Sequence, residues 1–332
     1  MILDGREAHS IALAAAELGR GNLVSFPTET VYGLGADASS DAAVQKIFAA
    51  KGRPSNHPLI VHVAEAADAL HFAASVPAFA QKLMDAFWPG PLTLILPRKA
   101  GIATASAGGQ DSIGLRCPSH PVAQALLRAC RALPGQPVTG LAAPSANQFG
   151  RVSPTTASHV QGEFGSSLMV LDGGACEVGI ESTIVDCTRG APVLLRPGLI
   201  ERGQIEAACG SALVLPGAAA GVAPRASGTL EAHYAPNAKL RLMDAAALQT
   251  ALNLLGPDAA NIAIYSRVIL MTPAAGVIRR RMPDDAAATA QQLFAVLRDF
   301  DAKGVRLIWV ETPPDTPAWE GVRDRLQRAS AA

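Results

Sequence analysis

The chain has 332 residues, more than one ordinary domain of about 100 to 200 residues, so two domains are expected. Hydrophobic residues make up 49% of the chain and charged residues 17%, which excludes an intrinsically disordered or fibrous protein. The 28 Lys and Arg residues balance the 28 Asp and Glu residues. A net charge of zero argues against non-specific nucleic-acid binding, which depends on a basic excess.

The amino-terminal segment carries Asp4 and Glu7 and lacks the basic start of a secretory signal. No uncharged apolar run approaches the roughly 20 residues that span a bilayer. The five cysteines are odd in number and form no CxxC pair, which favours reduced core thiols over disulfides or a metal site. We therefore expect a cytoplasmic protein with no membrane segment and no metal ligands of its own.

Strand-like and helix-like segments alternate from the start of the chain, which is typical of an α/β domain. Residues 183–196 read as two strands joined by a turn at 187–190, so the sheet is expected to be mixed. The expected strands are 23–26, 58–63, 92–96, 113–116, 138–142, 169–172, 183–186 and 193–196, and the expected helices are 11–18, 41–50, 77–87 and 121–133.

Residues 216–236 are rich in Ala, Gly and Pro and show no apolar period, which predicts a linker between domains. We expect a catalytic domain at 1–213, a linker or possible lid at 214–237, and a smaller Rossmann-like α/β domain at 238–332. In the second domain the expected strands are 239–243, 262–265, 268–271 and 305–310, and the expected helices are 245–255, 284–301 and 319–327.

Standard nucleotide-binding signatures do not explain the sequence. A GxxxxGK[ST] phosphate loop is absent. Residues 33–38 match the relaxed GxGxxA dinucleotide pattern, but Arg53 and its neighbours stand where that motif requires an acidic residue. Dinucleotide binding is therefore not expected.

An apolar stripe at positions i, i+3, i+4 and i+7 of one expected helix ends in a lysine. The stripe consists of Val44, Ile47, Phe48 and Lys51. A lysine at such a position commonly extends its charge to solvent along the surface. Here Gly52 and Arg53 follow the helix, and two cations beside a glycine turn favour an anion site instead.

Further polar residues interrupt the expected strands. His62 alone is more often a packed core histidine than a ligand, whereas Arg116, on a mid-sheet strand, is rarely left unpaired. Residues 144–147 and 181–183 place small hydroxyl and amide groups beside apolar strands, where they serve either as caps or as substrate contacts. A triphosphate is the natural counterpart of the four cations Lys51, Arg53, Arg116 and Arg196.

Six motifs together carry a family resemblance. They are TETVYGL at 28–34, KGRP at 51–54, PSAN at 144–147, SPT at 153–155, ESTIVD at 181–186 and RPG at 196–198. Their order and spacing resemble the YrdC-like threonylcarbamoyl-AMP synthases over about residues 8 to 210. The second domain and the HYAP sequence at 233–236 resemble the long, two-domain form of that family.

The resemblance implies a YrdC-like twisted mixed-sheet domain and an enzyme, a nucleotidyltransferase. It implies that L-threonine, bicarbonate and ATP, with Mg²⁺, form L-threonylcarbamoyladenylate and pyrophosphate. A separate transferase complex would then modify tRNA, and RNA contact by this chain would be weak or indirect. The implied catalytic residues are Lys51 and Arg53; the implied ATP contacts are Lys51, Arg53, His57, Ser112, Ser145, Asn147, Ser153, Arg196 and Tyr234; the implied L-threonine contacts are Thr30, His62, Arg116 and Ser182.

The sequence departs from the family pattern in the linker, where residues 226–231 read ASGTLE in place of the frequent SPGMKY. Two other functions were weighed. A carbamoyl-adenylate-forming carbamoyltransferase shares the domain type, but those proteins resemble larger chains with CxxC zinc fingers. A non-catalytic RNA-binding protein would use a basic concave face, which the zero net charge and the polar motifs disfavour.

Overall fold

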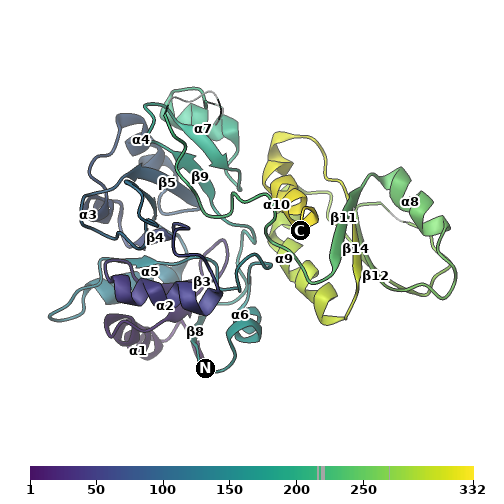
Figure 1. Ribbon diagram of the computed structural model, residues 1–332, viewed down its shortest axis with the longest axis horizontal. Helices are drawn as coiled ribbons and strands as arrows, with labels where there is room; N and C mark the ends of the chain where they lie inside the picture. Colours follow the sequence, from purple (N-terminus) through teal and green to yellow (C-terminus); the bar gives the residue numbers. More distant parts are fainter. Residues whose placement is uncertain (215–216, 218–220, 269) are drawn as a thin grey trace. The chain divides into compact units, whose positions relative to one another are not determined.

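The computed structural model describes residues 1–214, 217, 221–268 and 270–332, which divide into two compact units (Figure 1). The first unit consists of residues 1–149 and 153–229, and the second of residues 150–152 and 230–332. The expected linker at 214–237 is divided between the two units, and its residues 215–216 and 218–220 lie outside the described residues.

The first unit is built on a ten-stranded mixed sheet with the order β1-β8-β2-β3-β7-β4-β6-β5-β9-β10. The expected hairpin is confirmed, because β9 and β10 pair antiparallel. Parallel pairs, such as β4 with β6, occur in the same sheet as antiparallel ones, such as β5 with β6. The strands are Ile2–Asp4 (β1), Val24–Phe26 (β2), Gly33–Asp37 (β3), Ile60–Val63 (β4), Leu92–Pro97 (β5), Ser112–Arg116 (β6), Gly140–Ala142 (β7), Met169–Asp172 (β8), Thr183–Asp186 (β9) and Val193–Arg196 (β10).

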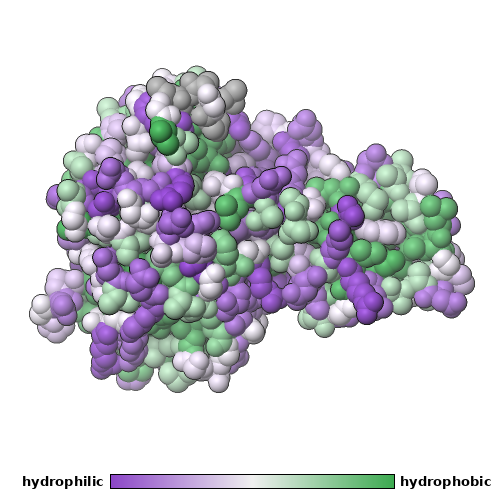
Figure 2. Space-filling view, viewed as in Figure 1, coloured by the Kyte–Doolittle hydropathy of each residue, from purple (hydrophilic) through white to green (hydrophobic). Residues whose placement is uncertain are grey.

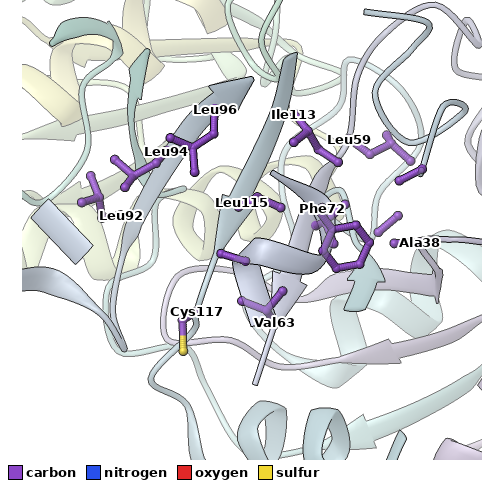
Figure 3. Packing of buried hydrophobic residues seen from close by; sticks show 14 of the residues in the cluster. Ala38, Leu59, Val63, Phe72, Leu92, Leu94, Leu96, Ile113, Leu115 and Cys117 are labelled. Atoms are coloured by element: carbon purple, nitrogen blue, oxygen red, sulfur yellow. The ribbon is translucent and has the colours of Figure 1, made fainter. Parts of the chain in front are cut away.

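Helices cover this sheet and bury its apolar side chains. Leu92, Leu94 and Leu96 of β5 are all buried, and the central strand β6 adds Ile113 and Leu115 to the same cluster (Figure 3). The helices are Ala8–Gly19 (α1), Asp41–Lys51 (α2), Ala69–Phe72 (α3), Ala78–Phe87 (α4), Pro121–Arg131 (α5), Ala157–Phe164 (α6) and Arg202–Cys209 (α7), with a 3-10 turn at Ala66–Asp68 (η1).

The glycine-rich segment after the TET motif forms strand β3 inside the sheet, which the sequence analysis did not predict. Its glycines permit close packing on the neighbouring strand: a Cβ atom at Gly35 would lie 2.8 Å from Cε1 of Phe26. A glycine-rich strand has few apolar side chains from which to recognise an alternating pattern. The same segment therefore matched a dinucleotide pattern by composition alone.

The second unit contains a four-stranded parallel sheet with the order β11-β14-β12-β13. The strand expected at 268–271 is wrong: residues 268, 270 and 271 are not in a strand, and residue 269 lies outside the described residues. The strand that follows β12 in the chain is instead β13, at the edge of the sheet. Its three arginines at 279–281 interrupt the alternation of apolar and polar residues by which a strand is recognised. The elements are Lys239–Met243 (β11), Ala245–Asn253 (α8), Ala260–Ser266 (β12), Gly276–Arg281 (β13), Ala286–Ala302 (α9), Leu307–Glu311 (β14), Pro317–Trp319 (η2) and Glu320–Ser330 (α10).

The visible surface mixes hydrophilic and hydrophobic residues, with green areas around α8 (Figure 2). Within the described part of the chain, no helix combines the length and the apolar character required to cross a bilayer. The same residues contain no group of three His, Cys, Asp or Glu side chains arranged to hold a metal ion.

Candidate active site

The carboxyl end of α2 places a lysine inside the first unit. The Ser40 hydroxyl caps the start of the helix by accepting a hydrogen bond from the Ala43 N–H, and Gly52 ends the helix in the left-handed conformation, with φ of 61°. The stripe predicted from the helical period is buried, and Lys51 is 2% exposed. Helix periodicity therefore predicted correctly that Lys51 faces the interior.

The Lys51 ammonium holds the loop that contains the PSAN motif. Its Nζ donates hydrogen bonds to the backbone oxygens of Ser145, at 2.6 Å, and of Asn147. Burial, and then the charge of Arg53, lowers the pKa of Lys51 well below its ordinary value. An ammonium has three protons, so a bound anion near the third would favour the charged form.

Arg53 and His57 lie together beside Phe149. The Arg53 guanidinium is 5.5 Å from the centre of the Phe149 ring, and the His57 ring meets the same ring edge-on at 5.4 Å. Nη2 of Arg53 donates to the Pro58 oxygen at 3.0 Å and to Oγ of Ser227 at 3.2 Å. Burial and the charge of Arg53 lower the pKa of His57. Arg53 and His57 therefore flank the same aromatic ring, and their predicted ATP contacts stay predictions.

Arg196, at the end of β10, connects Ser182 to the linker. Its Nε donates to the Ser182 backbone oxygen at 3.0 Å, and its Nη2 donates to the Ser182 hydroxyl at 3.1 Å. Nη1 donates to the Ser227 oxygen at 2.9 Å. The Ser182 hydroxyl also shares a hydrogen bond of 2.7 Å with Thr93. Ser227 thus contacts two of the cations predicted from sequence, Arg53 and Arg196.

Two other predicted ATP contacts lie at separate places in the first unit. Ser112 begins β6 and lines a cavity together with Gly114, Thr93 and Ser227. The buried hydroxyl of Ser153 donates a hydrogen bond to the carboxylate of Glu181. Both serines therefore present hydroxyl groups near residues of the predicted site.

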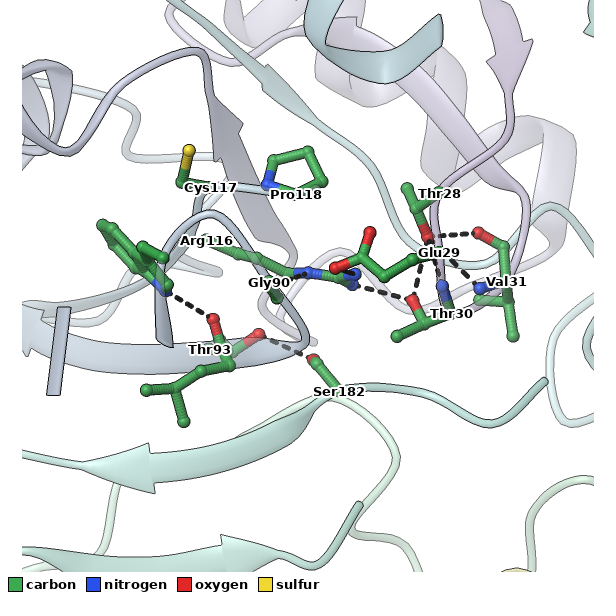
Figure 4. A network of polar contacts seen from close by, with 12 residues as sticks. Thr28, Glu29, Thr30, Val31, Gly90, Thr93, Arg116, Cys117, Pro118 and Ser182 are labelled. Atoms are coloured by element: carbon green, nitrogen blue, oxygen red, sulfur yellow. Dashed lines mark hydrogen bonds and ion pairs between the residues drawn. The ribbon is translucent and has the colours of Figure 1, made fainter. Parts of the chain in front are cut away.

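A second cluster surrounds Arg116 at the end of β6 (Figure 4). Nη1 of Arg116 donates to Oγ1 of Thr30 at 2.8 Å, and Nη2 lies 2.7 Å from Oε1 of Glu29. The hydroxyls of Thr28 and Thr30 share a hydrogen bond of 2.8 Å. Figure 4 shows Thr93 and Ser182 below this cluster. The structure thus gathers three predicted threonine contacts, Thr30, Arg116 and Ser182, from distant segments.

His62, the fourth predicted threonine contact, is 3% exposed and pairs with Arg116 in the parallel register of β4 and β6. Its ring meets Phe26 edge-on at 6.1 Å. Burial, and then the charge of Arg116, lowers the pKa of His62 to about 3. The ring is therefore neutral near pH 7.

Tyr234 belongs to the second unit, whereas the residues above belong to the first. Its ring stacks on Phe294 with centres 5.5 Å apart, and the Arg325 guanidinium lies 5.4 Å from the ring centre. The backbone of Tyr234 is left-handed, with φ of 63°. Its predicted ATP contact stays a prediction.

Sequence reasoning did not select several residues of the two clusters, namely Thr28, Glu29, Thr93, Glu181 and Ser227. Glu29 and Glu181 stand inside motifs that were recognised, so a charged residue at a position expected to be buried was an available signal. Thr93 and Ser227 carry no comparable signal, because their neighbours come from distant segments.

The models of two sequence families match the chain. The family described as "Telomere recombination" matches residues 16–198, and the family described as "Threonylcarbamoyl-AMP synthase, C-terminal domain" matches residues 200–331. The threonylcarbamoyl-AMP synthase of Bacillus subtilis is 38% identical over 331 residues, covering 96% of this chain and 92% of that protein. The threonylcarbamoyl-AMP synthase of Pyrococcus abyssi is 36% identical over 341 residues, covering 98% and 95%.

Solved structures agree with the sequence relatives. The Pyrococcus abyssi Sua5 protein complexed with L-threonine superposes with a TM-score of 0.87 at 34% identity, covering 98% of this chain and 95% of that one. Escherichia coli YciO shares the fold over 62% of this chain, with a TM-score of 0.52 at 21% identity. The chain therefore belongs to the two-domain threonylcarbamoyl-AMP synthases, nucleotidyltransferases of the pathway that forms threonylcarbamoyladenosine in tRNA.

Proposed function

We propose that the first unit joins L-threonine, bicarbonate and ATP into L-threonylcarbamoyladenylate and releases pyrophosphate, with ATP entering as its Mg²⁺ complex. One observation carries the proposal: Lys51 and Arg53 of one segment and Arg196 of another are all buried in the first unit, and Ser227 contacts both arginines. A triphosphate carries several negative charges, and charge-assisted hydrogen bonds from Lys and Arg are the usual way in which proteins hold phosphate groups.

Each cluster has a chemical match in one substrate. The nucleotide would contact Lys51, Arg53 and Arg196 through its phosphates. The hydroxyl and amide groups of Ser112, Ser145, Asn147 and Ser153, with His57, would complete the part of the ATP site that the first unit provides. The carboxylate of L-threonine would pair with Arg116, while Thr30 and Ser182 offer hydroxyl groups and His62 a neutral ring. The relative solved with L-threonine supports this second assignment.

The reaction needs no covalent intermediate on the protein. Bicarbonate takes up a proton and loses water to give CO₂. The neutral amine nitrogen of threonine then forms a bond to the carbon of CO₂, one C–O π bond becomes the carbamate oxyanion, and the proton that leaves the nitrogen passes to water. An oxygen of the resulting carbamate then attacks the α-phosphorus in line, and the bond to pyrophosphate breaks. The residues of the chain contribute by positioning the two substrates and by neutralising charge on the phosphates.

The adenylate product is labile in water, so we propose that it passes to a separate tRNA-modifying transferase complex with little direct RNA contact by this chain. The proposal includes a cytoplasmic location, because ATP and tRNA are both available there. Cell fractionation tests the location: recovery of the chain with membranes would contradict it.

Pyrophosphate release from labelled ATP tests the activity. With L-threonine and bicarbonate both present, we expect pyrophosphate and a new adenylate in equal amounts. Omission of either substrate should stop both products. Pyrophosphate that forms without threonine would overturn the assignment of the amino-acid site, and tight RNA binding without turnover would overturn the enzymatic function.

A further inference from the structure

A buried carboxylate in the threonine subsite is absent from the predicted contacts. Glu29 lies between Thr28 and Thr30 and is 4% exposed. Its Oε1 is 2.7 Å from Nη2 of Arg116, and both side chains of this ion pair are buried. Figure 4 shows the carboxylate and the guanidinium facing each other. A carboxylate is seldom buried unless it is paired and hydrogen-bonded, so its surroundings decide its role.

The surrounding residues do not satisfy the Glu29 carboxylate. Among the residues that the structure describes, neither Oε1 nor Oε2 accepts a hydrogen bond of acceptable geometry, although Oε1 is close to Arg116. The adjacent hydroxyls are engaged elsewhere: Oγ1 of Thr28 donates to the Val31 oxygen at 2.7 Å, and Oγ1 of Thr30 accepts from Arg116. A carboxylate offers about four lone-pair positions. The geometry therefore leaves room for an N–H or O–H donor from a ligand.

The other titratable groups around Glu29 do not balance its charge. His120, Cys117 and Cys176 are near enough for the charge of Glu29 to influence them. Burial lowers the pKa of His120 and raises the pKa of both thiols, so all three tend to be neutral near pH 7. Arg116 is therefore the counter-charge of Glu29 in the ligand-free protein.

The Arg116 guanidinium also has a hydrogen-bond donor left over. Its Nη2 donates no hydrogen bond within the described chain, despite the short distance to Glu29. The site thus presents an acceptor-only group and a donor-only group side by side. An α-amino acid presents the reverse pair, an ammonium and a carboxylate on one carbon.

We propose that Glu29 binds the α-amino group of the amino-acid substrate, while Arg116 binds its carboxylate. This inference rests on the proposed threonine subsite and adds a residue to it. Glu29 accepts a hydrogen bond from an amino N–H before reaction, and the single N–H of the carbamate can keep that contact. Glu29 therefore holds the nitrogen lone pair in a defined direction while the carbamate forms and is adenylated.

A simpler role for Glu29 would be to orient Arg116. The two roles are distinguished by 3-hydroxybutanoate of matching configuration, which has a hydrogen atom in place of the amino group of threonine and so offers Glu29 no donor there. Titration calorimetry would measure binding of both compounds to the full chain and to Glu29→Gln. If Glu29 binds the amino group, Glu29→Gln weakens threonine binding roughly 10- to 100-fold and changes binding of the hydroxy acid by less than about threefold. Equal weakening of both compounds would overturn the proposal, since both carry the carboxylate that Arg116 binds.

Two controls keep the test interpretable. Glu7→Gln changes an exposed glutamate in the same unit and should alter neither affinity. ATP binding by Glu29→Gln should equal that of the unchanged protein, which shows that the variant is folded. If Glu29→Gln does not fold, the unchanged protein still tests whether the amino group is bound. It should bind threonine at least roughly tenfold more tightly than the hydroxy acid. Equal affinities would overturn the role of Glu29, whereas no binding of threonine at all would overturn the proposed function.

Discussion

The backbone oxygen of Ser227 accepts a hydrogen bond of 2.9 Å from Nη1 of Arg196, 31 residues earlier in the chain. The Ser227 hydroxyl donates to the Pro58 oxygen at 2.8 Å and accepts from Arg53 at 3.2 Å. A residue of the expected linker therefore contacts two of the arginines that we assign to the triphosphate. If ATP binds these arginines as we propose, Ser227 and ATP compete for the same N–H donors.

Ser227→Ala removes the hydroxyl from this competition. We expect ATP to bind roughly threefold more tightly, because one hydrogen bond that stabilises the ligand-free form is lost. Titration of both proteins with ATP measures the change, and Ser211→Ala, at an exposed serine, is the matched control. Weaker ATP binding by Ser227→Ala would show that the hydroxyl helps to hold the nucleotide.

Arg53→Ala should reduce kcat/KM by roughly 100- to 1,000-fold, since one charged donor to the transition state is lost. The melting temperature should change little, because the Pro58 oxygen still accepts a hydrogen bond from Ser227. Pyrophosphate release and thermal unfolding check the two effects, with the exposed Arg128→Ala as control. A large loss of stability would mean that Arg53 is structural.

ATP binding should be accompanied by proton uptake within the pH range below 10.5, the ordinary pKa of a lysine. Burial and Arg53 lower the pKa of Lys51 in the ligand-free protein, and the negative charge of a triphosphate would raise it again. Calorimetry in two buffers with different ionisation enthalpies measures the number of protons. Lys51→Met should abolish the uptake, whereas Lys82→Met, at an exposed lysine on α4, should leave it unchanged.

His62 should make the fold less stable in acid. Its pKa is about 3 in the folded protein and 6.5 as the ordinary value, so the unfolded chain binds the extra proton between these limits. Stability is therefore complete above about pH 6.5 and falls as the pH drops toward 3, by at most about 1.4 kcal/mol per pH unit.

Chemical denaturation of His62→Gln at pH 7 and pH 5 tests this slope. The variant should lose less stability between the two pH values than the unchanged protein. His9→Gln, at an exposed histidine, provides the control. An identical loss in His62→Gln and in the unchanged protein would show that His62 does not contribute to acid sensitivity.

Local patterns predicted much of the fold and part of the site. The helical period placed Lys51 on a buried stripe, and the expected hairpin at 183–196 predicted the mixed sheet of the first unit. The prediction of strands failed where apolar and polar side chains do not alternate clearly. The glycines of β3 and the arginines of β13 concealed strands that sheet pairing nonetheless formed.

By itself, the sequence determined the α/β class, the family and the set of cations, because helix period, strand alternation and motif chemistry are properties of neighbouring residues. Only the tertiary structure decided their partners. Arg116 meets Thr30 across 86 residues and pairs with Glu29 beside it, and Ser227 reaches Arg53 across 174 residues. Such contacts depend on the order of the strands in the sheet and on the course of the loops. Neither can be read from the spacing of residues within a short segment. The neutral net charge of the whole chain therefore gives no sign of the buried cations Lys51, Arg53, Arg116 and Arg196.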